Sequence, residues 1–349
     1  MNIDAPTRQV MVVIPTLNEA KTIATVINNL AGNVPADTNV RIVVVDGCST
    51  DGTPDIVRRI MKWRPNVELL RNPRRIQSVA VNRAADMLGA GVDVLVRCDA
   101  HAEYPPDYVG RLLKTLDETG ADAVVVPMDS KGRGCFQRAV AWVSNTPVGS
   151  GGSAHRGGRR SGFVDHGHHA AIRMDSFRRA GGYDETFTHN EDAELDCRQS
   201  QFGSRIYLDG ETRLGYFPRS HPVSLWRQYF AYGRGRSRTV RRHPGSMRLR
   251  QLAVPVHVVA VVLMLIASVW SQWLVLWPSL YAAVLLLTSS IGIWRLQSAC
   301  GIFAGVAAGI MHVSWAFGFF AGLIFVRQSA WLAQPVSARE EMPAGVGTP

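Results

Sequence analysis

The sequence has 349 residues, 46% of them hydrophobic, and its 38 Lys and Arg residues against 28 Asp and Glu residues give a formal net charge of +10. A chain of this length and composition can bury a sizeable core and has room for two regions. The five cysteines are scattered and form no CxxC pair, which argues against a disulfide framework or a structural zinc site and favours a reducing compartment. The positive charge is concentrated, since residues 212–339 contain no Asp or Glu, whereas ten arginines lie between Arg213 and Arg250.

Short apolar runs alternate with helical patterns over the first 130 residues. The second helix has an expected N-cap at Thr53 and a proline, Pro54, at its first helical position. Apolar runs that are continuous in character and separated by helices are typical of a parallel sheet covered on both faces. The expected strands are residues 10–14, 40–45, 67–70, 92–96 and 121–127, and the expected helices are residues 19–30, 53 onward, 75–88 and 107–119.

Polar clusters follow three of these strands: PTLNE at 15–19, DGCSTDG at 46–52 and DAH at 99–101. Ligands of such sheets bind beyond the carboxyl ends of the strands, so we expect the three clusters to converge on one rim. The turn after the first strand contains no glycine and lacks the GxGxxG fingerprint, and the sequence has no P-loop. A Rossmann oxidoreductase is therefore disfavoured.

Three segments of the C-terminal third are predicted to span a membrane. Residues 252–270, 273–294 and 302–326 contain no charged side chain and are long enough, at about 1.5 Å per residue, to cross a hydrocarbon core of roughly 30 Å. A buried soluble helix would explain one such segment, but three in succession favour membrane insertion. The arginine-rich run before them should face the cytosol, which places the C-terminus outside, and it fits anionic lipid headgroups better than nucleic acid. Residues 1–9 show no secretory signal.

Six motifs in order resemble those of the family-2 glycosyltransferases. They are IPTLNE, VVDGCSTDGT, NPRRIQSVAVNRA, RCDAH, AAIRMDSFRRAGGYDETFTHNEDAEL and IYLDGETRLGYFPRSH. The resemblance implies a GT-A fold, an α/β domain with a mainly parallel sheet that binds a nucleotide-diphospho-sugar. The stretches RCDAHA, HRGGRRSGFVDHG and YFAYGRGR, with the three predicted spans, resemble the succinoglycan-biosynthesis group within that family.

The resemblance also implies a domain organisation. Residues 1–245 would form the GT-A domain, with a nucleotide-sugar-binding half at 8–130 and an acceptor-binding half, including the arginine-rich juxtamembrane segment, at 131–245. Residues 246–330 would hold the three transmembrane helices. Residues 331–349 would form a disordered tail.

The motif RCDAH stands where the family usually has Asp-x-Asp, whose carboxylates serve a metal ion, the diphosphate and the ribose. Asp99 matches the first carboxylate, and His101 replaces the second. A divalent cation bridging the diphosphate would offset the charge that grows as the sugar leaves. Mg²⁺ prefers oxygen ligands and Mn²⁺ accepts imidazole, so His101 favours Mn²⁺, although a non-ligand role for it is equally open. Asp99 could instead cap the next segment.

The same resemblance assigns a nucleotide-sugar pocket to the first two strand ends. Asp46 would recognise the base by accepting a hydrogen bond from the uracil N–H group. Leu17 departs from the family, many of whose members have an aromatic residue there to stack on the base. Ordinary turn or capping roles would also explain Thr16 and Asp46. The predicted nucleotide-sugar residues are Pro15, Thr16, Leu17, Glu19, Asp46, Gln77 and Asp99, and Arg74 and Arg75 are weaker candidates for the diphosphate.

An inverting transfer needs a carboxylate that takes the proton of the attacking hydroxyl group. Asp192 in HNEDAELDC matches the family's catalytic base, and Glu191 matches its companion carboxylate. The alternative is that both acids merely stabilise the dipole at a helix N-terminus.

Four histidines and two arginines are candidates for the acceptor side. His166, His168 and His169 have the spacing H-x-H-H, and with His189 they could bind zinc, but no cysteine or carboxylate pattern accompanies them. An acceptor-pocket role, chiefly for His168, or a packing role is therefore preferred. The resemblance places Arg234 and Arg236 where membrane-bound relatives contact the diphosphate and the acceptor, although the full Q/R-x-x-R-W motif is absent.

The resemblance therefore implies an inverting hexosyltransferase that uses a nucleotide-activated sugar, with UDP-glucose as the expected donor. The expected acceptor is an undecaprenyl-diphosphate-linked saccharide in exopolysaccharide assembly, at the inner membrane, with a cytosolic catalytic domain and other assembly proteins as partners. Two alternatives stay open. A processive polysaccharide synthase is disfavoured by the missing motif, and a catalytically silent membrane scaffold is disfavoured by Asp46, Asp99 and Asp192.

Overall fold

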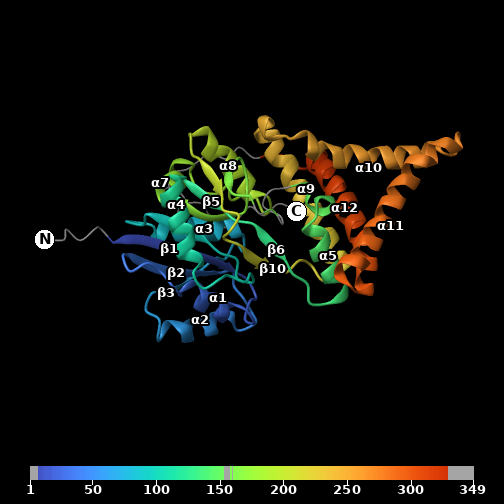
Figure 1. The fold of residues 1–349 in the computed structure, drawn as a ribbon. Coiled ribbons are helices and arrows are strands. Elements are labelled where there is room, and N and C mark those ends of the chain that lie inside the picture. Colours follow the sequence, from blue (N-terminus) through green and yellow to red (C-terminus); the bar gives the residue numbers. More distant parts are fainter. Residues whose placement is uncertain (1–6, 153–157, 159, 329–349) are drawn as a thin grey trace.

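The computed structural model describes residues 7–152, 158 and 160–328, and it places an α/β domain ahead of a group of long helices (Figure 1). The tail predicted at 331–349 lies outside the described residues. The α/β domain contains an eight-stranded sheet and a small two-stranded sheet.

The large sheet has the strand order β3-β2-β1-β4-β8-β5-β9-β7. β1 pairs in parallel with both β2 and β4, and β8 is antiparallel to β4 and β5. Since β1 lies between β2 and β4, the strand order reverses there, and a ligand is expected at the carboxyl ends of these strands. The strands are β1 (Arg8–Thr16), β2 (Thr38–Asp46), β3 (Val67–Arg71), β4 (Val94–Arg97), β5 (Ala123–Val125), β7 (Gly162–Val164), β8 (His169–Arg173) and β9 (Ile206–Leu208), with β6 (Met128–Ser130) and β10 (Leu214–Tyr216) forming the small sheet.

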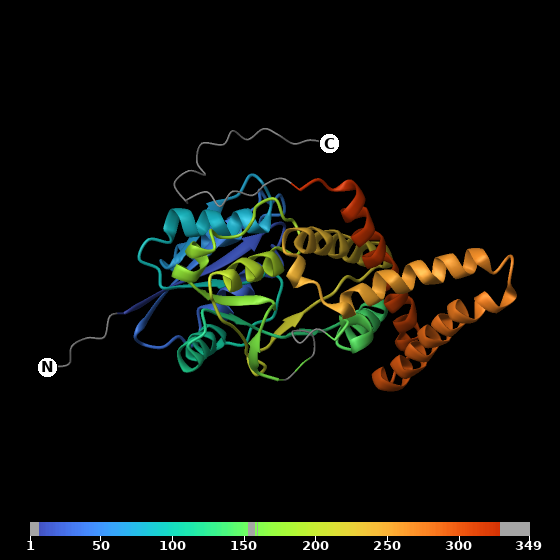
Figure 2. The same cartoon turned by 90° about the horizontal axis from the view of Figure 1, so that it is seen from above.

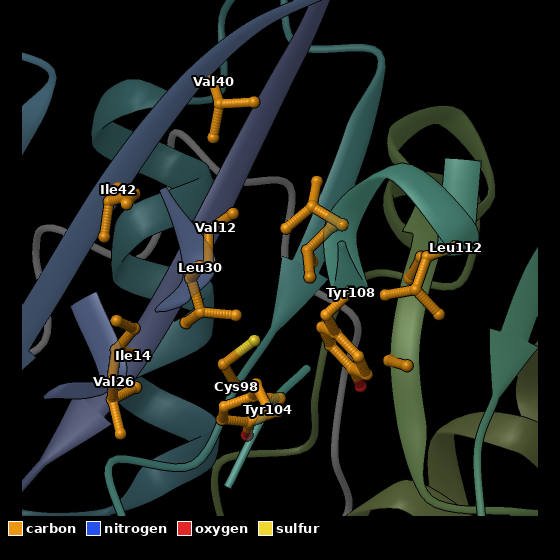
Figure 3. Packing of buried hydrophobic residues seen from close by; sticks show 14 of the residues in the cluster. Val12, Ile14, Val26, Leu30, Val40, Ile42, Cys98, Tyr104, Tyr108 and Leu112 are labelled. Atoms are coloured by element: carbon orange, nitrogen blue, oxygen red, sulfur yellow. The ribbon is translucent and has the colours of Figure 1, made fainter. Parts of the chain in front are cut away.

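Helices cover both faces of the large sheet, as the continuous apolar runs predicted. Along β1, Val12 and Ile14 point into one buried cluster and Met11 and Val13 into the other. Figure 3 shows the packing of the first cluster, in which Val12 and Ile14 lie beside Val26 and Leu30. The first face is covered by α1 (Ile23–Leu30), α2 (Thr53–Met61) and α4 (Tyr108–Thr119), and the second by α3 (Gln77–Leu88), α7 (Met174–Arg179) and α8 (Glu191–Gln201).

The second half of the chain supplies long helices at one side of the sheet domain. Three of them are long and apolar enough to cross a membrane, as predicted. Figures 1 and 2 both show α10 and α11 extending away from the sheet domain, with α9 and α12 nearer to it. The long helices are α9 (Pro222–Arg242), α10 (Leu249–Ala267), α11 (Leu276–Leu296) and α12 (Phe303–Phe325), with short 3₁₀ turns η1 (Pro244–Ser246), η2 (Gln272–Val275) and η3 (Ala299–Ile302). Two shorter helices, α5 (Cys135–Ser144) and α6 (Pro147–Ser150), precede them in the chain.

Two local predictions need correction. The expected N-cap Thr53 is already helical, and its hydroxyl group donates to Asp51 at 2.5 Å and accepts from the Glu19 N–H group at 2.9 Å. The cysteines are not all unpaired, because Cys135 at the start of α5 forms a disulfide with Cys300 in η3. The two lie 165 residues apart, so only the packing of α5 against η3 brings them together, and sequence spacing gave no sign of it.

Candidate active site

A cavity of about 1370 Å³ extends from the carboxyl end of β4 to the long C-terminal helices. Its wall includes the loop before β8, the start of α8, and side chains of α9, α10 and α12. Such a cavity is large enough for a nucleotide sugar or a similar ligand. Of the predicted site residues, it is lined by Gln77, Asp99, His101, His168, Glu191, Asp192 and Arg236.

The Arg97 guanidinium group lies at the centre of the carboxylates in this cavity. Its side chain is only 5% exposed, and Nη1 lies 3.0 Å from Asp192 Oδ2. Its Nη2 lies 3.3 Å from Asp99 Oδ1 and 3.9 Å from Glu191 Oε1. One cation thus brings Asp99 together with the adjacent pair Glu191 and Asp192, more than 90 residues later in the sequence, and the predicted metal ligand and the predicted base share one cleft.

The two neighbouring acids of α8 have opposite protonation behaviour. Burial, and then the adjacent Asp192 carboxylate, raise the pKa of Glu191 to about 7. Burial alone would also raise the pKa of Asp192, but the Arg97 and His169 cations lower it well below the ordinary value. Asp192 therefore stays ionised and can accept a proton, whereas Glu191 exchanges its proton near neutral pH.

His169 joins Asp192 to a second buried carboxylate. The ring is fully buried, with Nε2 2.6 Å from Asp196 Oδ1 and Nδ1 3.3 Å from Asp192 Oδ1. Burial would lower the pKa of His169, but Asp196 and then Asp192 raise it to about 10. Tyr183 donates its hydroxyl hydrogen to Asp192 Oδ1 at 3.0 Å. Arg97, Tyr183 and His169 thereby fix the orientation of the Asp192 carboxylate.

The predicted zinc alternative for the histidines finds no support in the described part of the chain. No group of three or more His, Cys, Asp or Glu side chains there is arranged to hold a metal ion. His169 is part of the buried ion-pair network, and His166 Nδ1 lies 2.8 Å from Asp196 Oδ2. His168 lies between the two main carboxylates, 3.7 Å from Asp99 Oδ2 and 3.7 Å from Asp192 Oδ2.

The predicted base and ribose residues lie at the ends of β1 and β2, beside the cavity rather than in its lining. Asp46 Oδ2 accepts a hydrogen bond from the Ser49 N–H group at 3.0 Å, whereas Asp46 Oδ1 is buried and has no hydrogen-bond partner among the described residues. An unsatisfied buried carboxylate oxygen is unusual and fits a site for a ligand N–H group. Pro15 and Thr16 end β1, and Leu17 is 43% exposed.

The two residues predicted to hold a divalent cation, Asp99 and His101, both line the cavity. His101 Nδ1 contacts Glu19 Oε1 at 2.9 Å, and the imidazole 3.7 Å from the Asp99 carboxylate belongs to His168. Gln77 donates to Asp99 Oδ1 at 3.1 Å. Magnesium-like ions are often held by one or two carboxylates together with substrate phosphates, so the predicted cation site does not require His101 as a ligand.

The predicted arginine contacts are divided between two environments. Arg236 is buried, contacts Ser246 O, and donates to Gln251 Oε1 at 2.8 Å. Arg234 is exposed on α9 and does not line the cavity, but its positive charge, after burial, lowers the pKa of the cavity residue His189. Arg74 pairs with Glu185 at 2.5 Å, so it is engaged away from the cavity.

Sequence reasoning missed Arg97, Tyr183 and Asp196. Arg97 was visible in RCDAH, where a cation directly before a predicted metal carboxylate is a usable signal for a buried ion pair. Asp196 lies four residues after Asp192, on the same side of a helix, and that spacing was also readable. Tyr183 carried no comparable signal, because its contact with Asp192 depends on the turn between α7 and α8.

The raised pKa of Glu191 predicts a pH-dependent stability. Since its pKa in the fold, about 7, exceeds the ordinary 4.5, the contribution of Glu191 is fully present below about pH 4.5 and is lost as pH rises through about 7. Between pH 5 and pH 8 the free energy of unfolding of the wild-type protein should fall by roughly 1–3 kcal/mol, at about 1.4 kcal/mol per pKa unit. Glu191→Gln should not show this fall. Thermal unfolding of the detergent-solubilised protein at both pH values measures this. Glu118→Gln, at an exposed position, should leave the wild-type pH dependence unchanged; an equal change in both variants would contradict the assignment.

Comparisons with known proteins show which proteins this chain is similar to. The model of the family described as "Glycosyl transferase family 2" matches residues 11–181. The succinoglycan biosynthesis protein ExoA of Rhizobium meliloti (strain 1021) is 43% identical over 321 residues, which cover 91% of this chain and 96% of that protein. A dolichyl N-acetyl-alpha-D-glucosaminyl phosphate 3-beta-D-2,3-diacetamido-2,3-dideoxy-beta-D-glucuronosyltransferase of Methanococcus voltae is 23% identical over 243 residues, covering 67% of this chain and 74% of that protein.

Among solved structures, a mannosyltransferase from Pyrobaculum calidifontis, PcManGT, in complex with GDP-Man and Mn²⁺, aligns with a TM-score of 0.57 and 19% identity. The alignment covers 91% of this chain and 88% of that one. At this identity the likeness shows the fold, and it confirms the predicted fold class.

Proposed function

This chain belongs to glycosyl transferase family 2, as its motifs predicted, and we propose that it is an inverting hexosyltransferase acting on a lipid-linked saccharide. The relative with 43% identity is a succinoglycan biosynthesis protein, which supports a role in exopolysaccharide assembly. The proposed donor is UDP-glucose and the proposed acceptor is an undecaprenyl-diphosphate-linked saccharide.

On the donor side, Asp46 would accept a hydrogen bond from the base through its unsatisfied Oδ1, at the end of β2. Asp99 would hold a divalent cation, Mn²⁺ or Mg²⁺, which supplies Lewis-acid stabilisation of the departing nucleoside diphosphate. Gln77 fixes Asp99 by a hydrogen bond at 3.1 Å. The leaving group and the cation site would then lie on one side of the cavity, with Asp192 facing them.

On the acceptor side, a sugar hydroxyl group attacks the anomeric carbon as the bond to the diphosphate breaks. Asp192, held ionised by Arg97 and His169, takes the hydroxyl proton. Because attack and departure occur on opposite faces of the sugar, a single displacement inverts the anomeric configuration.

The extent of the cavity is the observation that supports a lipid-linked acceptor. From Asp99 and Asp192 the lining continues to Val254 of α10 and to Met311 and Trp315 of α12, which are helices apolar enough for a membrane. The lining also contains five arginines besides Arg97. An acceptor with a saccharide head, a diphosphate and an apolar chain matches these three kinds of surface. These arginines are Arg219, Arg236, Arg242, Arg248 and Arg250.

The arginine-rich segment before α10 supports a position at the cytosolic face of the bacterial inner membrane. Nucleotide sugars are made in the cytosol, so the Asp99 end of the cavity would open on that side. Other exopolysaccharide assembly proteins are proposed partners, since a single transfer requires enzymes that act before and after it.

The test is a donor and acceptor screen with the full-length protein in lipid nanodiscs. UDP-, GDP- and dTDP-sugars are each offered with a lipid-diphosphate-linked saccharide, and nucleotide release and product mass are measured with EDTA or added Mn²⁺. We expect UDP-glucose to add one sugar, EDTA to abolish the reaction and Mn²⁺ to restore it. The same saccharide without its lipid should react at least about tenfold more slowly.

Three outcomes would contradict the proposal. Long products would identify a processive synthase, and equal turnover of the lipid-free saccharide would remove the lipid-linked acceptor. Absence of nucleotide release with every donor, from protein that still binds UDP-sugar in a thermal-shift assay, would support the silent scaffold. Asp99→Asn tests the cation site, and Asp55→Asn, at a position 71% exposed on α2, is its matched control.

A further inference from the structure

We propose that α12 does not cross the bilayer but lies along its surface on the catalytic side, so that only α10 and α11 cross. The C-terminal end of the chain would then lie on the same side as the catalytic domain, not outside as the sequence pattern predicted. The inference rests on the proposed attachment to a membrane and is independent of the proposed reaction.

Helix α9 contacts the sheet domain from Gln228 to its last residue, Arg242. Near its start, Gln228 donates to the Tyr216 hydroxyl group at 2.9 Å. Near its end, Asn190 donates to Thr239 Oγ1 at 2.7 Å. The final turn pairs Arg242 with the buried Asp184. The axis of α9 therefore lies along the face of the catalytic domain rather than pointing away from it.

Helix α12 packs against the opposite side of this part of α9. A Cβ atom at Gly233 would overlap Trp315 O, one at Gly318 would overlap Phe230 O, and one at Gly322 would overlap Ser237 Oγ. From Phe230 and Gly318, through Ser237 and Gly322, to Arg241 and Val326, the contact positions increase along both helices, so the two run side by side in the same direction. Small residues are what permit such a close approach of two backbones.

Both ends of α12 are held by elements of the catalytic side. Just before its start, Cys300 is bonded to Cys135 of α5. In its middle, the His312 ring contacts Val148 O at 2.8 Å. Just after its end, Arg241 donates to Val326 O at 2.8 Å.

Two further contacts extend this attachment. Gln328 donates to the Arg238 backbone carbonyl at 2.7 Å. A buried apolar cluster unites α5, α9 and α12 through Ala139, Val140, Val143, Leu225, Ala304, Ala307, Ala308 and Met311. A helix of 23 residues, about 34 Å long at 1.5 Å per residue, cannot reach both sides of a bilayer while its two ends contact one domain.

The alternative would carry α9 into the hydrocarbon together with α12. The sequence of α9 contains six arginines, PVSLWRQYFAYGRGRSRTVRR, and charged side chains at the bilayer centre are strongly unfavourable. The burial of the three apolar helices differs accordingly. In its most apolar window α12 is 39% buried by protein, against 11% for α10 and 17% for the helix that includes α11.

The exposed side of α12 is suited to contact the lipid surface. Val306, Phe317 and Ile324 are 54%, 52% and 70% exposed and recur at helical spacing on the side away from α9. This apolar stripe is continuous in the chain with α10 and α11, whose exposed side chains are also apolar. The sequence of α12 is apolar all round, so it is the cover of α9 on one side that leaves a single apolar side free to contact the bilayer surface.

A dual reporter at the end of the full chain tests the topology. Green fluorescent protein fluoresces only when it stays in the cytosol, and alkaline phosphatase is active only after export, so a tandem fusion always reports one side. We expect fluorescence without phosphatase activity. Phosphatase activity without fluorescence would overturn the proposal.

Two controls calibrate that reporter. Fused to a chain that ends at Ser271, between α10 and α11, it should be exported. In a chain lacking residues 303–328 the reporter should remain fluorescent, as in the full chain, whereas three spans would require the deletion to change its side. Release of the full chain from membranes by carbonate would instead contradict the membrane attachment itself, whatever the result of the transfer assay.

The depth of the helix in the bilayer is a second measurement that needs neither fusion nor deletion. Nitroxide labels are placed at Val306, Phe317 and Ile324, and at Leu280 and Leu287 of α11 as the matched spanning control, in the full chain in phospholipid vesicles. The accessibility of each label to oxygen is compared with its accessibility to a polar nickel complex. The signal from labels on the native cysteines is subtracted first. We expect equal, shallow depths along α12 and a deep position on α11. A depth maximum in the middle of α12 would overturn the proposal.

Discussion

Asp192→Asn should lower the rate of sugar transfer at least ~100-fold while nucleotide-sugar binding stays close to that of the unchanged protein, since a general base contributes roughly 10²–10⁴ to a rate. The amide keeps the shape of the side chain and its contact with Tyr183, but it cannot take a proton from the acceptor hydroxyl group. Initial rates of product formation, with donor binding measured by calorimetry, separate the two effects.

Glu191→Gln and Asp175→Asn make this prediction specific. Asp175 is an exposed acid, 64% accessible, on the short helix α7, so its amide variant should transfer sugar at the normal rate. If Glu191 is only a companion carboxylate, Glu191→Gln should retain more activity than Asp192→Asn. The reverse order would move the base to Glu191, whose pKa near 7 suits proton transfer at neutral pH, and full transfer by Asp192→Asn would remove it from the mechanism.

Much of the sheet domain could be predicted because its signals are local. A strand covered on both faces needs apolar residues at every position, as in VMVVI at 10–14, and β1 at Arg8–Thr16 includes that whole run. The parallel order then fixed which strand ends would meet. Asp99 and Asp192 were both named from motifs, and the structure brings them to one guanidinium group.

The contacts that could not be predicted depend on tertiary packing. Nothing near Cys135 in the sequence indicates Cys300, because the disulfide follows from the approach of α5 to η3. Length and composition likewise describe α12 as a span, since those criteria count apolar residues without regard to which side they face. The glycines of α12 indicate close packing against another helix instead. This becomes evident only when they are seen to face Phe230 and Ser237 of α9.

The same packing links the membrane side of the molecule to the catalytic acids. On one side of α9, Gly233 accommodates the backbone at Trp315, and two residues later Gly235 accommodates the backbone at His189 on the other side. His189 is followed by Asn190, which precedes Glu191 and Asp192 at the start of α8. A single helix therefore separates α12 from the loop that positions the catalytic pair, which makes α9 a rigid spacer between the lipid surface and the site.

His169→Gln should destabilise the fold by roughly 3–5 kcal/mol, the range for removing one partner of a buried ion pair. The imidazolium lies between Asp196 and Asp192, and a neutral amide would leave the fully buried Asp196 carboxylate without its closest cation. Because the pKa of His169 is raised to about 10 from 6.5, its contribution is fully present below about pH 6.5 and is lost as pH rises through about 10. The difference between the wild-type and variant free energies of unfolding, measured by denaturant in detergent, should therefore be large at pH 6 and smaller at pH 10.5.

A double variant shows whether the loss comes from the unpaired charge or from altered packing. His169→Gln with Asp196→Asn removes both the cation and the carboxylate, so it should be less destabilised than the sum of the two single variants, as coupled residues in one network are. His166→Gln is the matched control, because that imidazole also contacts Asp196 but is 37% exposed and should lose less stability. Additive effects at positions 169 and 196, with no pH dependence in the difference, would mean that the ring serves only to fill space. The transfer rate of the single variant, measured where it is still folded, would then report whether Asp192 keeps its orientation without the imidazolium beside it.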